Sequence, residues 1–468
     1  MSREFFRGSR PRALAAAMVM ALVAAACGGD GDGGTTADAS AEDEAAEDAS
    51  AEGGSLSVAI VGNPQMEDIA ELTPEFFTEE TGIEVNYTVL EEQTLREIVT
   101  REAGAGGEQF DVVMIGMFEA PQFGQNDWLV PLDEYVENDE DWDADDIIES
   151  VRQGLSSDGT LYAAPFYAES SFVMYRQDVI DEAGLTMPEQ PTWAEVAEIA
   201  REIDTDEMAG ICLRGKPGWG DFGGPLGTVL NTFGASYWSA TESGEIGASR
   251  VDEPAFREAL EFYIGLLEDA GQEDAANASF NECLTQYLEG RVAMWYDATV
   301  AAGLLEADDS DVAGLNGYAL APVNKTESSG WLWSWALAIP QNAPDPDLAW
   351  EYIGWATGPD YLETAGEELG WAAVPPGTRN SLYENENYME AASAFADMTL
   401  RAMETAPIDN PGLEPRPGYA GIQFVGVPEF QDVGTRCTEQ FSAVIAGSQD
   451  LDAAIDACDQ IASDVAQE

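Results

Sequence analysis

The fold is decided by three short stretches of the sequence: LSVAIV at residues 56–61, IEVNYTVL at 83–90 and FDVVMI at 110–115. Runs of this length that are rich in Val and Ile are typical of strands buried in a parallel sheet. Residues 68–81 and 94–103, which lie between these runs, carry apolar side chains at helical spacing. Strands that alternate with helices predict an α/β architecture with a parallel sheet.

The same alternation continues through the rest of the chain. Thr192 is expected to cap a helix, because its hydroxyl can accept a hydrogen bond from a free N–H of the first turn. There is no tandem repeat and no second low-complexity linker after residue 55, so we expect one body of two interwoven lobes. The predicted helices are residues 193–203, 253–270 and 347–357, and the predicted strands are residues 292–296 and 337–339.

The composition excludes several classes of function. The chain has 468 residues, of which 45% are hydrophobic, so a large core is available. It contains no histidine, which removes histidine-based catalysis and every zinc site that includes histidine. With 89 acidic against 19 basic residues its formal charge is −70, and a surface this negative would repel nucleic acid.

The acidity has two interpretations. Lys216 and Lys325 are the only lysines of the sequence. Repulsion among so many carboxylates destabilises a folded chain unless counter-ions screen it, and in ~1 M salt the screening length is only ~3 Å. We therefore expect adaptation to a saline exterior, with a merely acidic and highly soluble surface as the alternative.

The N-terminus has the features of a bacterial lipoprotein signal. Four arginines precede an apolar run at residues 13–26 that ends at Cys27. A basic start, a short apolar run and small residues at the exit are typical of a secretory signal that is too short for a membrane span. We expect residues 1–26 to be a signal peptide and Cys27 to be lipidated, which would anchor the exported chain to the outer face of the cytoplasmic membrane. An ordinary cleaved signal, with Cys27 as a structural cysteine, is the alternative.

A tether is expected between this anchor and the folded body. Residues 27–54 consist almost entirely of Gly, Asp, Glu, Ala, Ser and Thr. Such a segment cannot bury enough apolar surface to offset its ordering entropy, so the sequence predicts an acidic, disordered linker.

Four further cysteines suggest disulfides. An even number in an exported protein is typical of disulfide bonding, and four cysteines allow three pairings. Residues 435–445 and 451–465 have the pattern of two short amphipathic helices that could form a hairpin. We favour Cys437–Cys458 together with Cys212–Cys283. Buried free thiols are the alternative.

Several segments carry side chains suited to ligand binding. The loop at residues 214–220 (RGKPGWG) holds Arg214, Lys216 and Trp219 in a rigid Gly/Pro turn, which offers fixed donors beside a flat apolar face. An exposed loop with a structural turn would have the same pattern. Asp297 ends the strand at residues 292–296 with a carboxylate that could accept hydrogen bonds from a pair of hydroxyls.

A tryptophan-rich stretch gives the second candidate surface. WLWSW at residues 331–335 places three tryptophans on one face of a strand, because side chains alternate along a strand. Indole rings stack well on the C–H faces of sugars and polyols, although packing in the core explains a single tryptophan equally well.

The sequence lacks the motifs of the common enzyme classes. No nucleophile elbow, Walker loop or dinucleotide fingerprint occurs in a suitable strand–turn–helix setting. Residues 141–149 resemble a calcium loop only loosely, since Asp146 stands where the turn glycine belongs and Arg152 where the bidentate glutamate belongs. We therefore expect no metal, no cofactor and no enzymatic activity, although a glycan hydrolase that uses one pair of the many carboxylates is the alternative.

Five motifs carry a family resemblance. The chain resembles the extracellular solute-binding proteins of ABC transporters and, within them, is most similar to the sorbitol/mannitol-binding proteins. The resemblance runs from about residue 55 to the C-terminus. Its motifs are residues 214–220, 294–302 (MWYDATVAA), 331–340 (WLWSWALAIP), 370–379 (GWAAVPPGTR) and 421–431 (GIQFVGVPEFQ).

This resemblance implies a type II periplasmic-binding fold, in which two α/β lobes meet at a hinge and enclose a ligand cleft. The chain would cross between the lobes near Phe166, Trp335 and Val374. The N-terminal lobe would comprise residues 55–166 plus 337–374, and the C-terminal lobe residues 167–336 plus 375–468.

The resemblance also implies the function. A monomeric chain would capture a polyol or small sugar by closing the cleft and deliver it to the permease subunits in the membrane. Binding of another mono- or oligosaccharide, or a receptor that feeds a signalling partner, is the alternative. The expected ligand-binding residues are Asn63, Tyr167, Glu169, Arg214, Lys216, Trp219, Asp297, Trp331, Trp333, Trp371 and Arg379.

Overall fold

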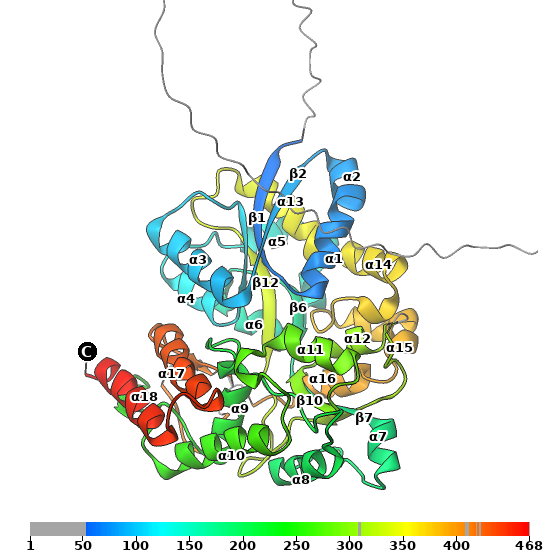
Figure 1. The fold of residues 1–468 in the computed structure, drawn as a ribbon. Helices are drawn as coiled ribbons and strands as arrows, with labels where there is room; N and C mark the ends of the chain where they lie inside the picture. Colours follow the sequence, from blue (N-terminus) through cyan, green and yellow to red (C-terminus); the bar gives the residue numbers. More distant parts are fainter. Residues whose placement is uncertain (1–52, 308–309, 408–410, 418, 421–422, 468) are drawn as a thin grey trace, which may run out of the picture. The chain divides into compact units, whose positions relative to one another are not determined.

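The computed structural model describes residues 53–307, 310–407, 411–417, 419–420 and 423–467 (Figure 1). The predicted signal peptide, the lipidation at Cys27 and the tether up to residue 52 lie outside the described residues. Within the described ranges, no helix is both long enough and apolar enough to cross a membrane.

A five-stranded sheet forms the first half of the structure. Its strand order is β2 (Glu84–Leu90), β1 (Ser55–Val61), β3 (Val112–Gly116), β12 (Trp333–Ala338) and β6 (Ala164–Glu169). Strand β1 pairs in parallel with β2 and β3, as the alternation of strands and helices predicts. Strand β12 is antiparallel to both of its neighbours, so the sheet is mixed. The N-terminal strands and β12 lie next to one another in Figure 1.

The helices next to this sheet begin and end close to the predicted positions. Helix α1 (Pro64–Thr73) starts earlier than expected, because Pro64 suits the first helical position, where no N–H is needed. A π-helical turn at Pro74–Thr78 then separates it from α2 (Glu79–Thr81). Helices α3 (Glu92–Ala105) and α13 (Pro346–Thr357) correspond to the helices predicted at residues 94–103 and 347–357.

A three-stranded antiparallel sheet forms the second half, in the order β10 (Met294–Ala298), β7 (Ser171–Arg176) and β11 (Asn316–Leu320). Ser170 alone separates β6 from β7, so the chain passes from the first sheet to the second at this residue. It returns to the first sheet between β11 and β12. The predicted lobe boundaries at 166/167 and 336/337 fall inside β6 and β12, and the division into lobes stays a prediction.

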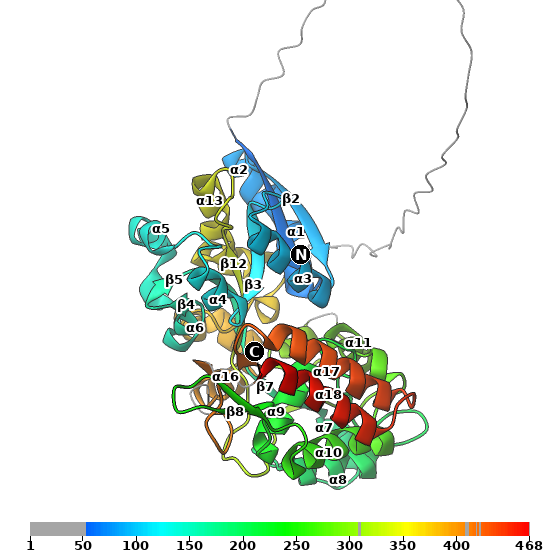
Figure 2. The same cartoon turned by 90° about the vertical axis from the view of Figure 1, so that its left-hand side faces the viewer.

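Helices of the second half follow the predicted pattern. Helix α8 (Trp193–Ile203) is capped as expected, since the Thr192 hydroxyl accepts from the Glu195 N–H at 3.2 Å and Glu195 accepts from the Thr192 N–H at 2.7 Å. Helix α10 (Pro254–Ala270) buries one face against α9 (Gly223–Phe233). Helices α17 (Phe430–Ile445) and α18 (Leu451–Val465) pack side by side in Figure 2.

The remaining elements are short. The helices are α4 (Glu119–Gln125), α5 (Asp133–Asn138), α6 (Glu149–Gly154), α7 (Gln177–Glu182), α11 (Phe280–Leu288), α12 (Ala301–Leu305), α14 (Pro359–Glu368), α15 (Glu386–Ala391) and α16 (Ala396–Glu404). Two-stranded pairs are β4 (Ser156–Ser157) with β5 (Thr160–Leu161), β8 (Trp238–Ala240) with β9 (Ile246–Ser249) and β13 (Tyr419–Ala420) with β14 (Val425–Gly426).

Two disulfides join the cysteine pairs that the sequence analysis favours. One links Cys437 on α17 to Cys458 on α18, with an S–S distance of 2.02 Å. The other links Cys212 to Cys283 on α11, with an S–S distance of 2.01 Å. All four cysteines are buried in the hydrophobic core.

Candidate ligand-binding site

A cavity lies where the two sheets approach each other. Strands β6 and β12 of the first sheet contribute Glu169 and Trp333 to its lining, and β10 of the second sheet contributes Ala298. Helices α3 and α11 contribute Arg96 and Phe280.

The walls of the cavity are largely indole rings. Trp331, Trp333 and Trp335 all line it, as the alternation along the predicted strand implies, and all three are buried. Trp219 joins them from the loop at residues 214–220, and its ring centroid lies 6.0 Å from that of Trp333. The rings fit because the neighbouring strand carries Gly116, where a Cβ would lie 1.9 Å from the Trp333 ring.

A buried arginine stands among these rings. The Arg96 guanidinium carbon lies 4.2, 4.5 and 5.0 Å from ring centroids of Trp219, Trp335 and Trp333, which are cation–π distances. Glu92 accepts from its Nη2 at 2.9 Å, and Glu119 also pairs with it. Burial alone would lower the pKa of Arg96, but the two carboxylates raise it above its ordinary value, so the charge is held in place.

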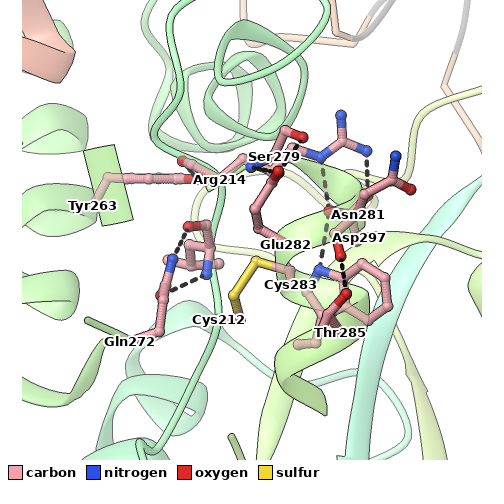
Figure 3. Close-up of a disulfide and its surroundings, with 12 residues drawn as sticks. Cys212, Arg214, Tyr263, Gln272, Ser279, Asn281, Glu282, Cys283, Thr285 and Asp297 are labelled. Carbon is pink, nitrogen blue, oxygen red and sulfur yellow. Dashed lines mark hydrogen bonds and ion pairs between the residues drawn. A yellow bond between two sulfur atoms is a disulfide. The ribbon is translucent and has the colours of Figure 1, made fainter. Parts of the chain in front are cut away.

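A second buried ion pair joins Asp297 to Arg214, which lines the cavity (Figure 3). Arg214 donates from Nε to Asp297 Oδ2 at 2.8 Å and from Nη2 to Oδ1 at 2.5 Å. The indole N–H of Trp295 donates to the same Asp297 Oδ2 at 3.0 Å. Burial acts to lower the pKa of Arg214, yet Asp297 raises it well above the ordinary value. Arg214 lines the cavity, whereas both oxygens of the Asp297 carboxylate accept hydrogen bonds from other residues of the protein.

Four buried polar atoms around the cavity form no hydrogen bond of good geometry among the described residues, although the Trp331 indole lies close enough to the Glu169 carboxylate to act to lower its pKa. The four atoms are Glu169 Oε2, Gln423 Oε1 and the indole nitrogens of Trp219 and Trp331. Buried polar groups in native proteins are almost always paired, so two donors and two acceptors gathered around one cavity call for a polar ligand or water. Burial raises the pKa of Glu169 well above its ordinary value, and Arg214 offsets only part of that shift.

Most of the predicted ligand-binding residues line this cavity. The seven that do so are Asn63, Tyr167, Glu169, Arg214, Trp219, Trp331 and Trp333. The Asn63 amide lies close to Tyr167, with its Nδ2 3.4 Å from the phenol oxygen. Their role in holding a ligand stays a prediction.

The structure places the other four predicted residues elsewhere. Lys216 forms a salt bridge with Glu91 at 2.6 Å, and Asp297 pairs with Arg214. Arg379 is buried over the Trp142 ring at 5.2 Å and donates to backbone carbonyl oxygens at 3.1 Å.

Trp371 is the fourth of these residues, and it is half-buried in a 3₁₀ turn. It packs against α14, where a Cβ on Gly366 would lie 2.7 Å from the Trp371 ring. None of these four side chains lines the cavity within the described part of the chain, because each is engaged by other residues.

Several lining residues were missed by the sequence analysis. Glu92 and Arg96 stand four residues apart on α3, a spacing that usually indicates an exposed ion pair. Trp335 belongs to the predicted tryptophan face and could have been included on that ground. Phe280 and Gln423 carry no local signal, since only the tertiary fold brings them to the cavity.

The fold places an aromatic cavity with buried polar atoms between the two sheets. No group of three metal-ligating side chains occurs within the described part of the chain. Residues 63–363 match the family model described as bacterial extracellular solute-binding protein, and the chain belongs to this family. Its members are binding proteins, which confirms the prediction of a non-enzymatic function.

Individual relatives align with most of the length of this chain. The mannitol-binding protein of Pseudomonas aeruginosa is 40% identical over 409 residues, which cover 86% of this chain and 91% of that protein. A solute-binding protein of Agrobacterium vitis, solved with bound D-mannitol, superposes with a TM-score of 0.85 at 42% identity and covers 88% of this chain and 98% of that one. A ribitol complex from Agrobacterium radiobacter, with a TM-score of 0.75 at 22% identity, covers 89% of this chain and 99% of that one and confirms the fold alone.

Proposed function

We propose that this chain is the substrate-binding protein of an ABC importer and that it binds a neutral polyol of the mannitol type. The observation that carries the proposal is the set of unpartnered polar atoms on Glu169, Trp219, Trp331 and Gln423 around one aromatic cavity. The names of the two relatives with about 40% identity support the same ligand class.

A polyol matches the chemistry of this cavity. Each hydroxyl can donate one hydrogen bond and accept others, so it suits a wall that offers both indole N–H donors and carbonyl or carboxyl acceptors. The C–H faces of the carbon chain would lie against Trp331 and Trp333. A few hydrogen bonds, each contributing ~0.5–1.5 kcal/mol or more beside charged groups, suffice for micromolar affinity at about −8 kcal/mol.

The electrostatics of the cavity favour a ligand without charge. Both arginines that line it are already ion-paired, Arg96 with Glu92 and Glu119 and Arg214 with Asp297. A phosphate or carboxylate on the ligand would therefore add a buried negative charge without gaining a free cation, which is costly. We infer that this site discriminates against sugar phosphates and sugar acids.

Contacts between the two halves favour capture by cleft closure. Lys216, from the loop at residues 214–220, pairs with Glu91 beside β2. Asn281 on α11 donates from Nδ2 to the carbonyl oxygen of Gly62, next to β1, at 3.0 Å. These contacts would break if the halves separated, and re-forming them would enclose the ligand and present both halves to the permease.

The location of the protein follows from its family and from its N-terminus. Members of the family are extracellular, which agrees with the secretory signal predicted at residues 1–26. We propose that a lipid on Cys27 holds the chain at the membrane. A Cys27→Ala chain should then be released into the medium by cells that retain the wild-type chain, and equal retention of both would contradict the anchor.

Calorimetry on the untethered body tests the binding function. We expect saturable one-to-one binding of D-mannitol, with the compound recovered unchanged. Heat only from a monosaccharide or oligosaccharide would keep the fold and overturn the polyol assignment. Recovery of a cleaved product would overturn the binding function itself.

A further inference from the structure

The disulfide between Cys212 and Cys283 joins the segment that carries Arg214 to helix α11 (Figure 3). Arg214, two residues after the first cysteine, and Phe280, three residues before the second, both line the cavity. The Arg214 guanidinium carbon lies 5.5 Å from the centroid of the Phe280 ring. The disulfide therefore joins the same two segments that the contact between Arg214 and Phe280 joins.

The segment around Cys212 positions Arg214. Cys212 donates its N–H to the Met294 carbonyl at 2.8 Å, which aligns the segment with β10. The Gln272 amide binds the backbone N–H and carbonyl of Leu213 at 3.2 and 2.6 Å. The Tyr263 hydroxyl donates to the Arg214 carbonyl at 2.7 Å. These hydrogen bonds hold the backbone of residues 212–214 in place.

The helix that carries Cys283 reaches both the cavity and the opposite half. Helix α11 begins at Phe280, next to Ser279, whose N–H and hydroxyl donate to Glu282 at 2.9 and 2.6 Å. Asn281 makes the contact with the Gly62 carbonyl oxygen. A shift of α11 relative to the Cys212 segment would displace Phe280 from Arg214 and would also move Asn281 away from the first sheet.

We propose that the Cys212–Cys283 disulfide is a positioning element of the ligand site, which holds Arg214 and Phe280 in register and couples the site to closure of the two halves. This inference rests on the proposed polyol binding. The other disulfide, Cys437–Cys458, joins α17 to α18, and none of its cysteines or their sequence neighbours lines the cavity in the described part of the chain. It reaches the binding loop through Thr438, next to Cys437, whose hydroxyl accepts from the Gly218 N–H at 3.0 Å, and it serves as the control for the loss of a disulfide as such.

The test compares two double variants, Cys212→Ala/Cys283→Ala and Cys437→Ala/Cys458→Ala. Both lose a bond that restricts the unfolded chain, so both should melt at a lower temperature. Mannitol binding is then measured by calorimetry well below both melting temperatures. We expect the first variant to bind about tenfold more weakly, within the usual range of coupling between two positions in a protein, and the second to bind like the wild type.

A reciprocal measurement on the wild-type chain needs no substitution. Both disulfides are buried, so a reductant reaches them only when the structure opens locally. Because coupling is reciprocal at equilibrium, mannitol should lower the reduced fraction of Cys212–Cys283 in a thiol redox buffer more than that of Cys437–Cys458, as measured by alkylation and mass spectrometry.

The outcomes separate the inference from the proposed function. Equal mannitol affinity in the wild type and the Cys212→Ala/Cys283→Ala variant, or equal protection of both disulfides by mannitol, would overturn the positioning role while mannitol binding stands. If the wild-type chain binds no mannitol, the proposed function fails and the inference fails with it.

Discussion

Arg214 and Asp297 bind each other through two hydrogen bonds of 2.8 and 2.5 Å, although the sequence predicts both as ligand contacts. Asp297 is fully buried, and the Trp295 indole and the Ala298 N–H occupy its oxygens as well, at 3.0 and 2.7 Å. The carboxylate therefore compensates the charge of Arg214, and Arg214 alone is left to face the cavity.

Replacing this carboxylate should destabilise the protein. In Asp297→Asn the buried guanidinium loses its counter-charge, which typically costs about 3–5 kcal/mol in the free energy of unfolding. Urea unfolding measures the loss. Asp269→Asn is the matched control, because its pair with Arg201 is about half exposed and should contribute less than about 1 kcal/mol. Similar losses in the two variants would contradict a buried structural pair.

The contact between Lys216 and Glu91 should govern how long a ligand stays bound. This salt bridge is partly exposed and joins the two halves, so Lys216→Met should alter global stability by less than about 1 kcal/mol. We expect it to raise the dissociation rate of mannitol severalfold, as measured by stopped-flow fluorescence. Lys325→Met removes the other lysine, whose pair with Glu258 at 2.9 Å lies within the second half, and should leave that rate unchanged. An equal effect of both variants would exclude a closure contact.

Asp221 should make the stability of the ligand-free protein depend on pH. Burial, with a contribution from the charge of Glu92, raises the pKa of Asp221 to about 8. Since an aspartate in the unfolded chain loses its proton near pH ~3.9, the folded chain holds one more proton between these values, and the free energy of unfolding falls as the pH rises through this window.

The variant Asp221→Asn cannot ionise, so its stability should decline less between pH 5 and pH 8 than that of the wild type. Thermal melting across this range measures the difference. Asp206→Asn, at an exposed position, should keep the wild-type slope. If the melting temperature of Asp221→Asn depends on pH as strongly as that of the wild type, Asp221 is already ionised in the folded chain and the prediction is wrong.

Gly220 should be essential for the close approach of the two halves. A Cβ at this position would lie 2.2 Å from Glu92 Oε1 and 3.0 Å from Arg96 Nε, so Gly220→Ala should displace this ion pair and lower the melting temperature. Gly224 also lines the cavity, but a Cβ there would meet no atom within 4 Å. Gly224→Ala should therefore melt no lower than the wild type. An unchanged melting temperature in Gly220→Ala would show that the Glu92–Arg96 pair can shift to make room for the Cβ, and it would contradict this prediction.

Salt should stabilise this protein strongly. Raising NaCl from about 0.1 to about 1 M shortens the screening length from ~10 to ~3 Å, which weakens the repulsion that a formal charge of −70 creates. We expect the melting temperature to rise over this range, and sucrose of equal osmolality to raise it less. A melting temperature that falls or stays constant with NaCl would contradict adaptation to a saline exterior.

The fold could be predicted because its signals are local. The runs at residues 56–61 and 83–90 become β1 and β2, and Thr192 caps α8 as its side chain predicts. The π-helical turn at Pro74–Thr78 and the antiparallel direction of β12 were not predicted, since both depend on packing between distant parts of the chain.

The site could be predicted only in part. The position of Trp333 follows from alternation along β12, which is a local rule, whereas Trp331 precedes this strand. The pairing of Arg214 with Asp297 joins residues 83 positions apart, and no pattern in the sequence shows which of many carboxylates an arginine will meet. Arg96 was missed for the same reason, because its burial among tryptophans brings together α3, β12 and the loop at residues 214–220.

A crystal structure of the chain with D-mannitol is the most direct test of polyol binding in this cavity. We expect one mannitol molecule there, hydrogen-bonded to Glu169 Oε2, Gln423 Oε1 and the indole nitrogens of Trp219 and Trp331, with its carbon chain against Trp331 and Trp333. Mannitol bound at another place, or a cavity in which water alone pairs these four atoms at saturating mannitol, would contradict it.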